Sequence, residues 1–343
     1  MASRHRVNPK TAHRRESIAT ALLAWYRQGH RDLPWRRTRD PYCIWVSEIM
    51  LQQTRAQAVI PYYERFLARF ADVDTLAAAA EEEVLALWSG LGYYSRARNL
   101  RRGAIAIRAA GGFPRDYAAI RELPGVGDYT ASAIASIAFG LPHAVLDGNV
   151  LRVVARVEND ASEITASAAR ERFRAIAQTW LDRRHPGEFN QAFMELGATV
   201  CLARNPLCLV CPLAAACRAR EHGTVERLPV MRPKAEPVRL SGTLLVVRRR
   251  GRVLLRRVEP EARRMAGFWE LPMLEHLPRA GSGAAIGKFR HSITNHRYTF
   301  TVASVGKTPD PDGPAFRWFQ PPEIERIPLS TTARKALKIA GIL

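Results

Sequence analysis

The sequence predicts two folded parts, an almost wholly helical first part and a smaller second part that mixes strands with helices. Three observations support this fold class. Apolar residues recur at helical spacing through much of the first 225 residues, a proline-containing stretch follows, and β-type runs come after it. The length of 343 residues allows about two domains. We expect a basic tail over 1–16, a helical domain over 17–225, a linker over 226–239 and a mixed domain over 240–343.

The helical part is defined by apolar periodicity and by its start and stop signals. Ile18, Leu22 and Trp25 predict a first helix over 17–28. "EEEVLALWSG" has acidic residues in its first turn and Gly90 at its end, which is typical of a short helix. By the same rules, helices are expected over 81–90, 95–112, 128–139, 149–158, 166–182 and 188–202.

The second part begins after the linker "ERLPVMRPKAEP", whose prolines favour an extended chain. Runs rich in β-branched and aromatic residues predict strands over 242–247, 252–258 and 296–305. Gly251 lies between the first two runs and indicates a hairpin turn. A last helix is expected over 329–340, capped by Ser330 or Thr331.

The net charge of +20 points to a polyanionic partner, and a generic solubility charge is the alternative. The longest apolar run, "AIASIAFGLPHAVL", is interrupted by Gly140 and Pro142, so we expect no membrane span. The N-terminus lacks the apolar core of a secretory signal. We therefore expect a cytoplasmic monomer, and an organelle transit peptide or a nuclear location stays open.

Four cysteines lie in "CLARNPLCLVCPLAAAC" with the spacing C-x6-C-x2-C-x5-C. Without a secretion signal, disulfides are not expected. Structural zinc usually shows two C-x2-C pairs, whereas this loop has one. The spacing favours an iron–sulfur cluster, with zinc as the alternative, and the expected ligands are Cys201, Cys208, Cys211 and Cys217.

The stretch "ELPGVGDYTASAIASIAFG" predicts two helices joined by a tight turn. Gly125 and Gly127 allow the backbone to turn sharply and to approach a ligand closely. The N–H groups at the start of the second helix could bind a phosphate. An ordinary corner between two helices is the alternative.

Two acidic residues, Glu48 and Asp147, lie in unusual sequence surroundings. Glu48 lies in the apolar run "IWVSEIML", where burial would raise its pKa and leave it protonated near neutral pH. Asp147, in "LDGNVLRVVARV", precedes a helix whose dipole favours the ionised form. An outward-facing Glu48 and a simple helix-capping Asp147 are the alternatives.

These motifs together resemble the helix-hairpin-helix DNA glycosylases, through LPGVG at 123–127, LDGNV at 146–150 and the four-cysteine loop. Three further stretches narrow the resemblance to the MutY-type adenine DNA glycosylases, namely LPWR at 33–36, SEIMLQQT at 47–54 and GLGYYSRARNL at 90–100. The resemblance implies an all-α helix-hairpin-helix glycosylase domain with an iron–sulfur loop, followed by a small α+β Nudix-like domain. It also implies a 4Fe–4S cluster as the cofactor.

The resemblance assigns chemical roles to the two carboxylates. Glu48 would protonate the adenine that leaves, and Asp147 would stabilise the positive sugar, by analogy with glycoside hydrolysis. Tyr129 and Asn149 are implied to be supporting groups. The substrate would be duplex DNA in which adenine is paired with 8-oxoguanine or guanine.

Because a duplex hides its bases, the resemblance also implies that the adenine is flipped out of the stack. Gln53 and Tyr93, with Leu91 alongside, correspond to groups inserted near the lesion. The remaining substrate-binding residues implied for the first part are Trp35, Arg36, Thr54, Gly125, Gly127 and Gln191.

The second part resembles the MutT-like C-terminal domain of this family through "GFWELP" at 267–272. The acidic residues expected for Nudix hydrolysis are missing, since the following stretch carries only Glu275, so a binding role is favoured. The family reads 8-oxoguanine with Phe-Ser-His, and this chain has Phe289, Arg290 and His291, followed by Ser292. Whether Arg290 or Ser292 contacts the lesion stays open.

Related enzymes of the endonuclease III type use a lysine amine to cut the strand after base removal. Tyr129 stands at that position, and residues 11–233 contain no lysine. A phenol cannot form the required Schiff base. The sequence therefore predicts a monofunctional glycosylase, with an endonuclease III-like lyase and a non-catalytic DNA-binding protein as the alternatives.

Overall fold

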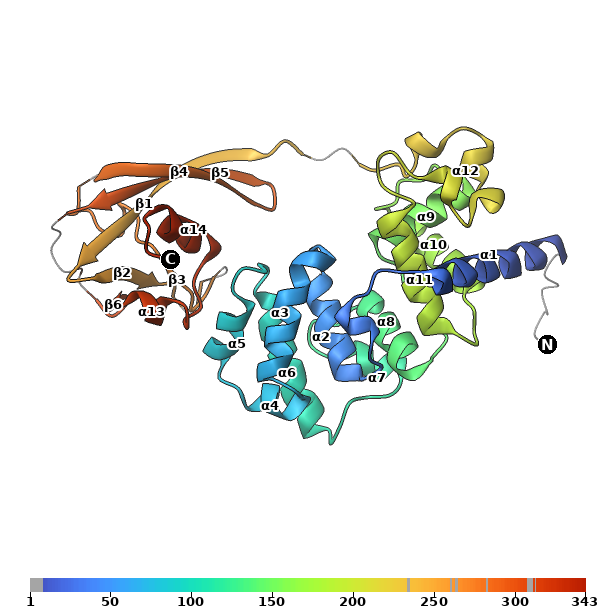
Figure 1. Ribbon diagram of the computed structural model, residues 1–343, viewed down its shortest axis with the longest axis horizontal. Coiled ribbons are helices and arrows are strands. Elements are labelled where there is room, and N and C mark those ends of the chain that lie inside the picture. Colours follow the sequence, from blue (N-terminus) through green and yellow to red (C-terminus); the bar gives the residue numbers. More distant parts are fainter. Residues whose placement is uncertain are drawn as a thin grey trace. The chain divides into compact units, whose positions relative to one another are not determined.

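The computed structural model describes residues 9–232, 235–259, 261–262, 265–281, 283–306, 311 and 313–343. Contacts divide the chain into two compact units (Figure 1). Unit 1 comprises residues 1–60 and 106–233, and unit 2 comprises residues 61–105 and 234–343. This grouping differs from the expected division, because the helical segment 61–105 belongs with the C-terminal part.

The regular elements of unit 1, over its described residues, are α-helices and short 3-10 helices. Its elements are α1 (Pro9–Gln28), η1 (Pro34–Arg36), α2 (Pro41–Leu51), α7 (Tyr117–Arg121), α8 (Asp128–Phe139), α9 (Gly148–Glu158), α10 (Ser167–Trp180), α11 (Pro186–Thr199), η2 (Cys208–Val210), η3 (Ala214–Ala216), α12 (Arg218–Glu221) and η4 (Val225–Arg227). The first helix begins at Pro9, so it extends into the range that we expected to be a basic tail. Residues 1–8 lie outside the described part.

The core of unit 1 holds the site-bearing helices together. Leu22 of α1, Val154 of α9 and Phe193 of α11 are buried in one cluster. Burying large apolar side chains in this way contributes roughly 1.5–3 kcal/mol each. The packing fixes the first turns of α8 and α9 and the middle of α11, where the predicted site residues lie.

Local signals explain where these helices begin and end. Asp40 caps α2 by accepting a hydrogen bond from the Cys43 N–H at 3.0 Å, and Pro41 occupies the first turn. The predicted helix over 128–139 is confirmed, and it ends at Gly140 with φ +67°, a left-handed conformation that glycine adopts readily.

Unit 2 combines helices with a mixed six-stranded sheet. Its elements are α4 (Val73–Ala78), α5 (Glu81–Trp88), β1 (Val238–Arg249), β2 (Arg252–Arg257), β3 (Trp269–Glu270), β4 (Ala284–Ile293), β5 (His296–Val305), β6 (Phe316–Phe319), α13 (Pro321–Ile324) and α14 (Thr331–Ile339). Two more helices, α3 (Ala56–Arg69) and α6 (Ser95–Ala109), run from one unit into the other. The strand order is β3-β2-β1-β5-β4, and β6 also pairs with β2.

The sheet is covered on both faces, and α14 covers one of them (Figure 1). Leu244 and Val246 of β1 pack with Ala336 and Leu337 of α14. The intervening Leu245 belongs to the cluster on the opposite face, as strand alternation requires. The predicted strand over 296–305 is confirmed, and Ser330 is the cap of the predicted last helix.

Over the described residues, every helix is too short or too polar to cross a lipid bilayer.

Candidate active site

A cavity of about 610 Å³ opens in unit 1, with walls contributed by α2, α8, α9 and α11. This volume is in the range of small-molecule sites, roughly 300–1,000 Å³. Gln53, Gly125 and Gly127 lie outside its wall. The wall contains eight residues that the sequence predicted at the site, namely Trp35, Arg36, Glu48, Thr54, Tyr129, Asp147, Asn149 and Gln191.

Glu48 is buried within α2 and is 4% exposed, so the alternative of an outward-facing glutamate is wrong. The Tyr129 hydroxyl donates a hydrogen bond to Glu48 Oε2 at 2.7 Å. Burial raises the pKa of Glu48 to about 7. The nearby charge of Asp147 adds to this shift, while the hydrogen bond from Tyr129 opposes it. Glu48 can therefore hold a proton near neutral pH, as its apolar neighbours predicted.

Tyr129 lies in the first turn of α8, two residues after Gly127. Its hydroxyl lies 3.1 Å from Met194 Sδ as well as contacting Glu48. Burial, together with the carboxylates of Glu48 and Asp147, raises the pKa of Tyr129 well above its ordinary value. The phenol therefore stays protonated and acts as a hydrogen-bond donor.

Asp147 is the N-cap of α9 and also faces the cavity. Its Oδ1 accepts the Val150 N–H at 2.7 Å, and its Oδ2 accepts the Asn149 side-chain amide at 3.0 Å. Asp147 is therefore a helix cap, as the alternative held, and it also forms part of the cavity wall. Burial raises the pKa of Asp147 despite these hydrogen bonds. The hydrogen bonds at the helix terminus lower the pKa of Asp147, as expected, but burial outweighs them and the net shift is upward.

A chain of hydrogen bonds leads from Asp147 to the cysteine loop. Asn149 Oδ1 accepts a hydrogen bond from Arg152 at 2.9 Å. The Arg152 guanidinium also donates to the carbonyl of Gly197 at 2.6 Å and to the carbonyl of Cys201 at 2.8 Å. Asn149 therefore orients Asp147 while it is itself held by Arg152.

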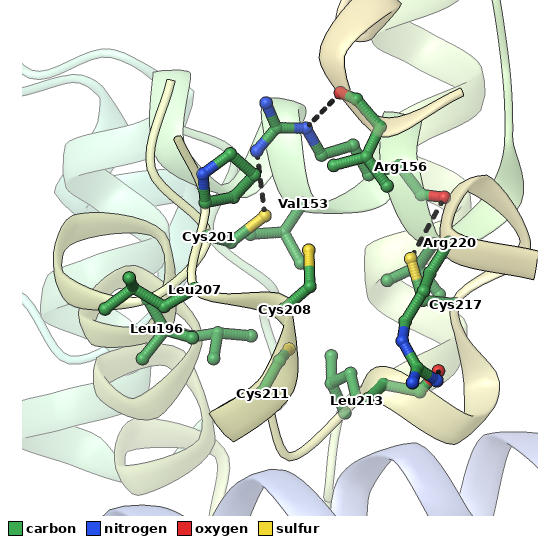
Figure 2. A pocket seen from close by; sticks show the side chains of 15 residues that line it. Val153, Arg156, Leu196, Cys201, Leu207, Cys208, Cys211, Leu213, Cys217 and Arg220 are labelled. Atoms are coloured by element: carbon green, nitrogen blue, oxygen red, sulfur yellow. Dashed lines mark hydrogen bonds between the residues drawn. The ribbon is translucent and has the colours of Figure 1, made fainter. Parts of the chain in front are cut away.

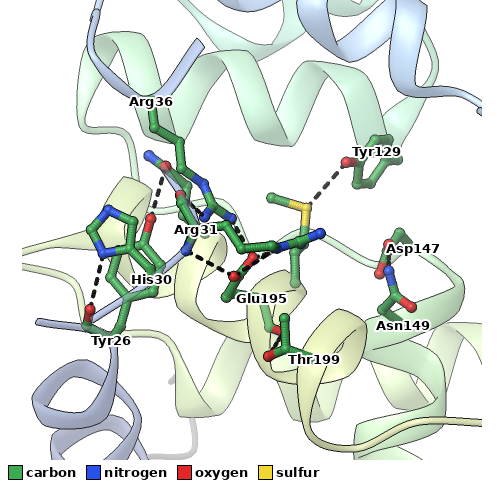
Figure 3. Close-up of polar contacts among 11 residues, drawn as sticks. Tyr26, His30, Arg31, Arg36, Tyr129, Asp147, Asn149, Glu195 and Thr199 are labelled. Carbon is green, nitrogen blue, oxygen red and sulfur yellow. Dashed lines mark hydrogen bonds and ion pairs between the residues drawn. The ribbon is translucent and has the colours of Figure 1, made fainter. Parts of the chain in front are cut away.

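Glu195 is a site residue that the sequence analysis missed, and its network is drawn in Figure 3. It is 2% exposed and accepts hydrogen bonds from Arg31 and Arg36, each at 2.7 Å. Burial alone would raise its pKa, but the two guanidinium groups lower the pKa to about 2. The available signal was an acidic residue in the apolar run "FMELGAT", the same kind of signal that marked Glu48.

The Glu195 network also holds two predicted residues in place. Arg36 reaches Glu195 from η1 and lies 5.5 Å from the ring centroid of Tyr26. The Tyr26 hydroxyl donates to Gln191 Oε1 at 3.2 Å. Arg36 and Gln191 both line the cavity, so this cluster fixes one part of its wall.

The glycine turn has the geometry that its sequence predicted. Gly125 has φ +78° and Gly127 is the N-cap of α8, and both are exposed. The Val126 N–H donates to the Leu123 carbonyl at 3.0 Å. The exposed backbone allows close approach of a phosphate.

The residues that correspond to inserted groups differ in exposure. Gln53 in unit 1 is exposed and has φ +57°. Tyr93 in unit 2 is 47% exposed and has φ +47°. Non-glycine residues adopt this left-handed region infrequently, and it is enriched at functional sites. Leu91 is buried and packs within unit 2.

The four cysteines of the loop line one small cavity, and no disulfide joins them (Figure 2). The remaining wall is largely apolar, with Val153, Leu196 and Leu213. Arg156 is fully buried beside them and donates to Cys201 Sγ at 3.3 Å and to the Leu202 carbonyl at 2.6 Å. In the described residues, no group of three or more His, Cys, Asp or Glu side chains is arranged to hold a single metal ion.

The second predicted recognition segment lies on β4, where side chains alternate between two faces. Phe289 and His291 are half-buried, whereas Arg290 and Ser292 are exposed on the other face. Phe289 packs on Phe300 of β5 with ring centroids 5.4 Å apart. Arg290 and Ser292 therefore present their side chains on the same side of the strand, two residues apart.

Residues 46–178 match the family described as HhH-GPD superfamily base excision DNA repair protein. The chain is 47% identical to the adenine DNA glycosylase of Homo sapiens over 219 residues, which cover 61% of this chain and 40% of that protein. A solved structure of a thermostable thymine-DNA glycosylase has a TM-score of 0.55 and 28% identity, and the match covers 62% of this chain and 99% of that one.

The chain spans less than half the length of the mammalian relatives that it matches. It covers more of the adenine DNA glycosylase of Mycolicibacterium smegmatis, with 42% identity over 205 residues, 59% of this chain and 69% of that protein. The resemblance stated from the motifs is confirmed by these matches. The chain belongs to the adenine DNA glycosylase family within the HhH-GPD superfamily.

Proposed function

We propose that this protein hydrolyses the N-glycosidic bond of adenine paired with 8-oxoguanine or guanine in duplex DNA. The observation that supports this most directly is the buried Glu48, whose pKa is raised to about 7, on the wall of a cavity that also contains Asp147. A proton donor and a second carboxylate at one cavity are what cleavage of a glycosidic bond requires.

In this mechanism Glu48 donates its proton to the five-membered ring of adenine, so that the base leaves as a neutral molecule. The sugar becomes positive as the bond breaks, and the Asp147 carboxylate stabilises or traps it. This positive charge favours the ionised form of Asp147 and offsets the effect of burial. Tyr129 orients Glu48, Asn149 orients Asp147, and water completes the hydrolysis.

Adenine must leave the duplex stack to reach this cavity. Trp35, Arg36, Thr54 and Gln191 line the space that would receive it. The exposed Gln53 and Tyr93 are the groups that we propose to enter the duplex near the lesion. Buried Leu91 would support Tyr93 rather than enter the stack itself.

Binding to the DNA backbone would involve Gly125 and Gly127 at the helix-hairpin-helix turn, aided by the net charge of +20. On β4, we propose that Phe289, His291 and either Arg290 or Ser292 read 8-oxoguanine. The protein would work as a monomer at cellular DNA, for example in a nucleoid.

Cys201, Cys208, Cys211 and Cys217 would hold a 4Fe–4S cluster. The donor set fits this group, because four thiols from one loop line an apolar cavity and a guanidinium donates to one of the sulfur atoms. When bound, the cluster would supply structural order to the loop and negative charge beside Arg156. The protein's own residues carry out the proposed hydrolysis.

The deciding experiment compares duplexes that differ only in the base opposite adenine. We expect adenine release to be fastest opposite 8-oxoguanine, slower opposite guanine and absent opposite thymine. Equal release from all duplexes, or none, would contradict the proposed substrate. Borohydride trapping of a covalent imine at the rate of base release would instead support a lyase, which the absence of lysine over residues 11–233 opposes.

A further inference from the structure

The loop 89–94, which joins α5 to α6, carries Tyr93 two residues before α6 and is held by two side chains of unit 2. The Trp88 indole N–H donates to the Gly92 carbonyl at 3.3 Å. Arg96 donates to the same carbonyl at 3.1 Å, and its guanidinium lies 5.6 Å from the ring centroid of Tyr93. The loop is therefore ordered locally, while the Tyr93 ring remains 47% exposed.

Both ends of this loop contact the C-terminal part of the same unit. Ser89 Oγ donates to the Leu329 carbonyl at 2.7 Å in a buried contact. At the other end, the rings of Tyr94 and Phe268 have centroids 4.0 Å apart. The Tyr94 hydroxyl lies 3.3 Å from Thr331 Oγ1. The segment that presents Tyr93 is thus bracketed by two contacts with residues more than 170 positions later in the chain.

Two short segments, 268–270 and 328–331, form the surface that receives the loop, and we call this surface the docking ledge. The Trp269 N–H donates to the Pro328 carbonyl at 2.8 Å, and the Ser330 N–H donates to the Trp269 carbonyl at 2.9 Å. Ser330 also caps α14 by accepting the Ala333 N–H at 3.1 Å. The docking ledge is therefore continuous with the start of α14.

The same helix reaches the recognition segment on β4. Lys335, one turn after Thr331 on the same side of α14, lies 5.7 Å from the ring centroid of Phe289. Its charge also acts on His291, whose pKa is lowered by burial and by Lys335. At Gly287, a Cβ would lie 2.5 Å from Ile339 Cγ2, so α14 and β4 are in close contact.

From this arrangement we propose that the docking ledge and α14 are positioning elements that couple the recognition segment on β4 to the loop that inserts Tyr93. The proposal rests on the proposed function, because the proposed function assigns roles at the lesion to Tyr93 and to residues 289–291. Phe268, Leu329 and Thr331 act through the ends of the loop and not on DNA.

The physical basis is the backbone of the loop. A non-glycine residue with positive φ has a strained backbone and persists only where its surroundings fix it. Tyr93 is such a residue, and Ser89 and Tyr94 fix the loop on either side of it. When β4 binds 8-oxoguanine, the position of β4 fixes the position of α14. Helix α14 in turn holds Thr331 and the docking ledge where they favour the inserted position of Tyr93. With guanine opposite adenine, this support is weaker.

The test removes hydroxyl contacts without changing the ring packing, in the full-length double variant Ser89→Ala/Tyr94→Phe. A duplex with 2-aminopurine beside 8-oxoguanine reports loss of base stacking on binding, and Tyr93→Ala defines the signal that insertion contributes. We expect the double variant to lose at least about half of that signal and to reduce the preference for 8-oxoguanine over guanine about fivefold, a typical coupling magnitude. An unchanged signal and preference overturn the proposal.

Two further variants separate positioning from general damage to the fold. Thr179→Val removes a hydroxyl that donates to Ile176 within its own helix in unit 1, and it should leave both readouts unchanged. Phe268→Leu weakens the ring contact between Phe268 and Tyr94, and it must lower both the 2-aminopurine signal and the preference for 8-oxoguanine. If Phe268→Leu leaves them unchanged while its melting temperature stays close to that of the wild type, the proposal fails.

A double-mutant cycle tests the coupling to β4. His291→Ala is measured both in the wild type and in the Ser89→Ala/Tyr94→Phe variant. It should reduce the preference for 8-oxoguanine in the wild type, and the reduction in the double variant should be at least about threefold smaller. Additive effects mean that β4 and the loop act independently. Because the fluorescence signal needs no base removal, an inactive wild type that still shows Tyr93 insertion would contradict the proposed function alone.

Discussion

Two buried glutamates in unit 1 occur in similar sequences, but their pKa values are shifted in opposite directions. Glu48 of α2 is 4% exposed and Glu195 of α11 is 2% exposed. Glu48 receives a hydrogen bond from one phenol, and burial raises its pKa to about 7. Glu195 accepts from two guanidinium groups, which overcome burial and lower its pKa to about 2. A carboxylate in an apolar run therefore indicates a site, but its partners determine its chemistry.

This difference gives the two carboxyl groups different roles: Glu48 lines the cavity, whereas Glu195 holds Arg31 and Arg36, which line it. Glu195 is a permanent anion that fixes Arg31 and Arg36 in place, and it has no proton to give near neutral pH. Glu48 accepts a hydrogen bond from the neutral Tyr129 phenol, and its raised pKa leaves it able to hold and transfer a proton near neutral pH.

The largest expected effect is the loss of base release in Glu48→Gln. The amide keeps the shape of the side chain and can accept from Tyr129, but it cannot donate an acidic proton. Removing a general acid typically costs about 10²–10⁴-fold, so single-turnover adenine release should fall by about 10³-fold. Duplex binding measured in parallel should persist. A variant that releases adenine at the wild-type rate means that Glu48 is not the acid.

The second effect is the pH dependence of the wild type. In the proposed mechanism Glu48 acts in its protonated form, and its pKa is about 7. Above that pH, the single-turnover rate should therefore fall about tenfold per pH unit, as the protonated fraction of Glu48 falls. Rates measured from pH 5 to pH 9 at constant ionic strength check this. A rate that rises through pH 7 would identify a base and not an acid.

The fold was predictable from sequence where the signals are local. The helix over 128–139 and the strand over 296–305 match because Gly140 stops the first and alternation defines the second. The β4 strand was not recognised, since its alternation is interrupted by an irregularity between Ala285 and Gly287. The grouping of 61–105 with the C-terminal part depends on contacts such as Tyr94 with Phe268, which local patterns do not encode.

The candidate site shows the same limit. Glu48 and Asp147 could be found because each lies in an unusual short stretch. The role of Glu195 depends on Arg31 and Arg36, which lie 164 and 159 residues away in the chain. The pKa of Asp147 departed from expectation for a similar reason, because burial comes from tertiary packing while the capping signal is local.

The third prediction concerns the stability of the Glu195 network. Glu195→Gln leaves Arg36, whose side chain is 10% exposed, without its buried counter-charge. Breaking a buried ion pair from one side costs about 3–5 kcal/mol, and the partial exposure of Arg31 reduces this, so we expect a loss of about 3 kcal/mol. Urea denaturation at pH 7 measures it. A variant as stable as the wild type would show that the arginines are adequately solvated.

The smallest effect is a gain in stability expected for Glu48→Gln, opposite in sign to the loss expected for Glu195→Gln. The folded-state pKa of Glu48, about 7, lies above its ordinary value of 4.5, so between these pH values the folded protein retains a proton that the unfolded chain has lost. The stability of the wild type therefore falls as pH rises through this window. Glutamine does not titrate, so the variant should equal the wild type near pH 5 and exceed it by about 2 kcal/mol at pH 8.

Urea denaturation of both proteins at the two pH values measures this difference, and Glu195→Gln is the matched control. Its wild-type carboxylate has a depressed pKa, so its contribution is present above the ordinary pKa and is lost only in acid towards about pH 2. The deficit of Glu195→Gln should therefore be nearly equal at pH 5 and pH 8. If Glu48→Gln is destabilised at pH 8, Glu48 is ionised and paired in the folded protein, and the contrast between the two glutamates is lost.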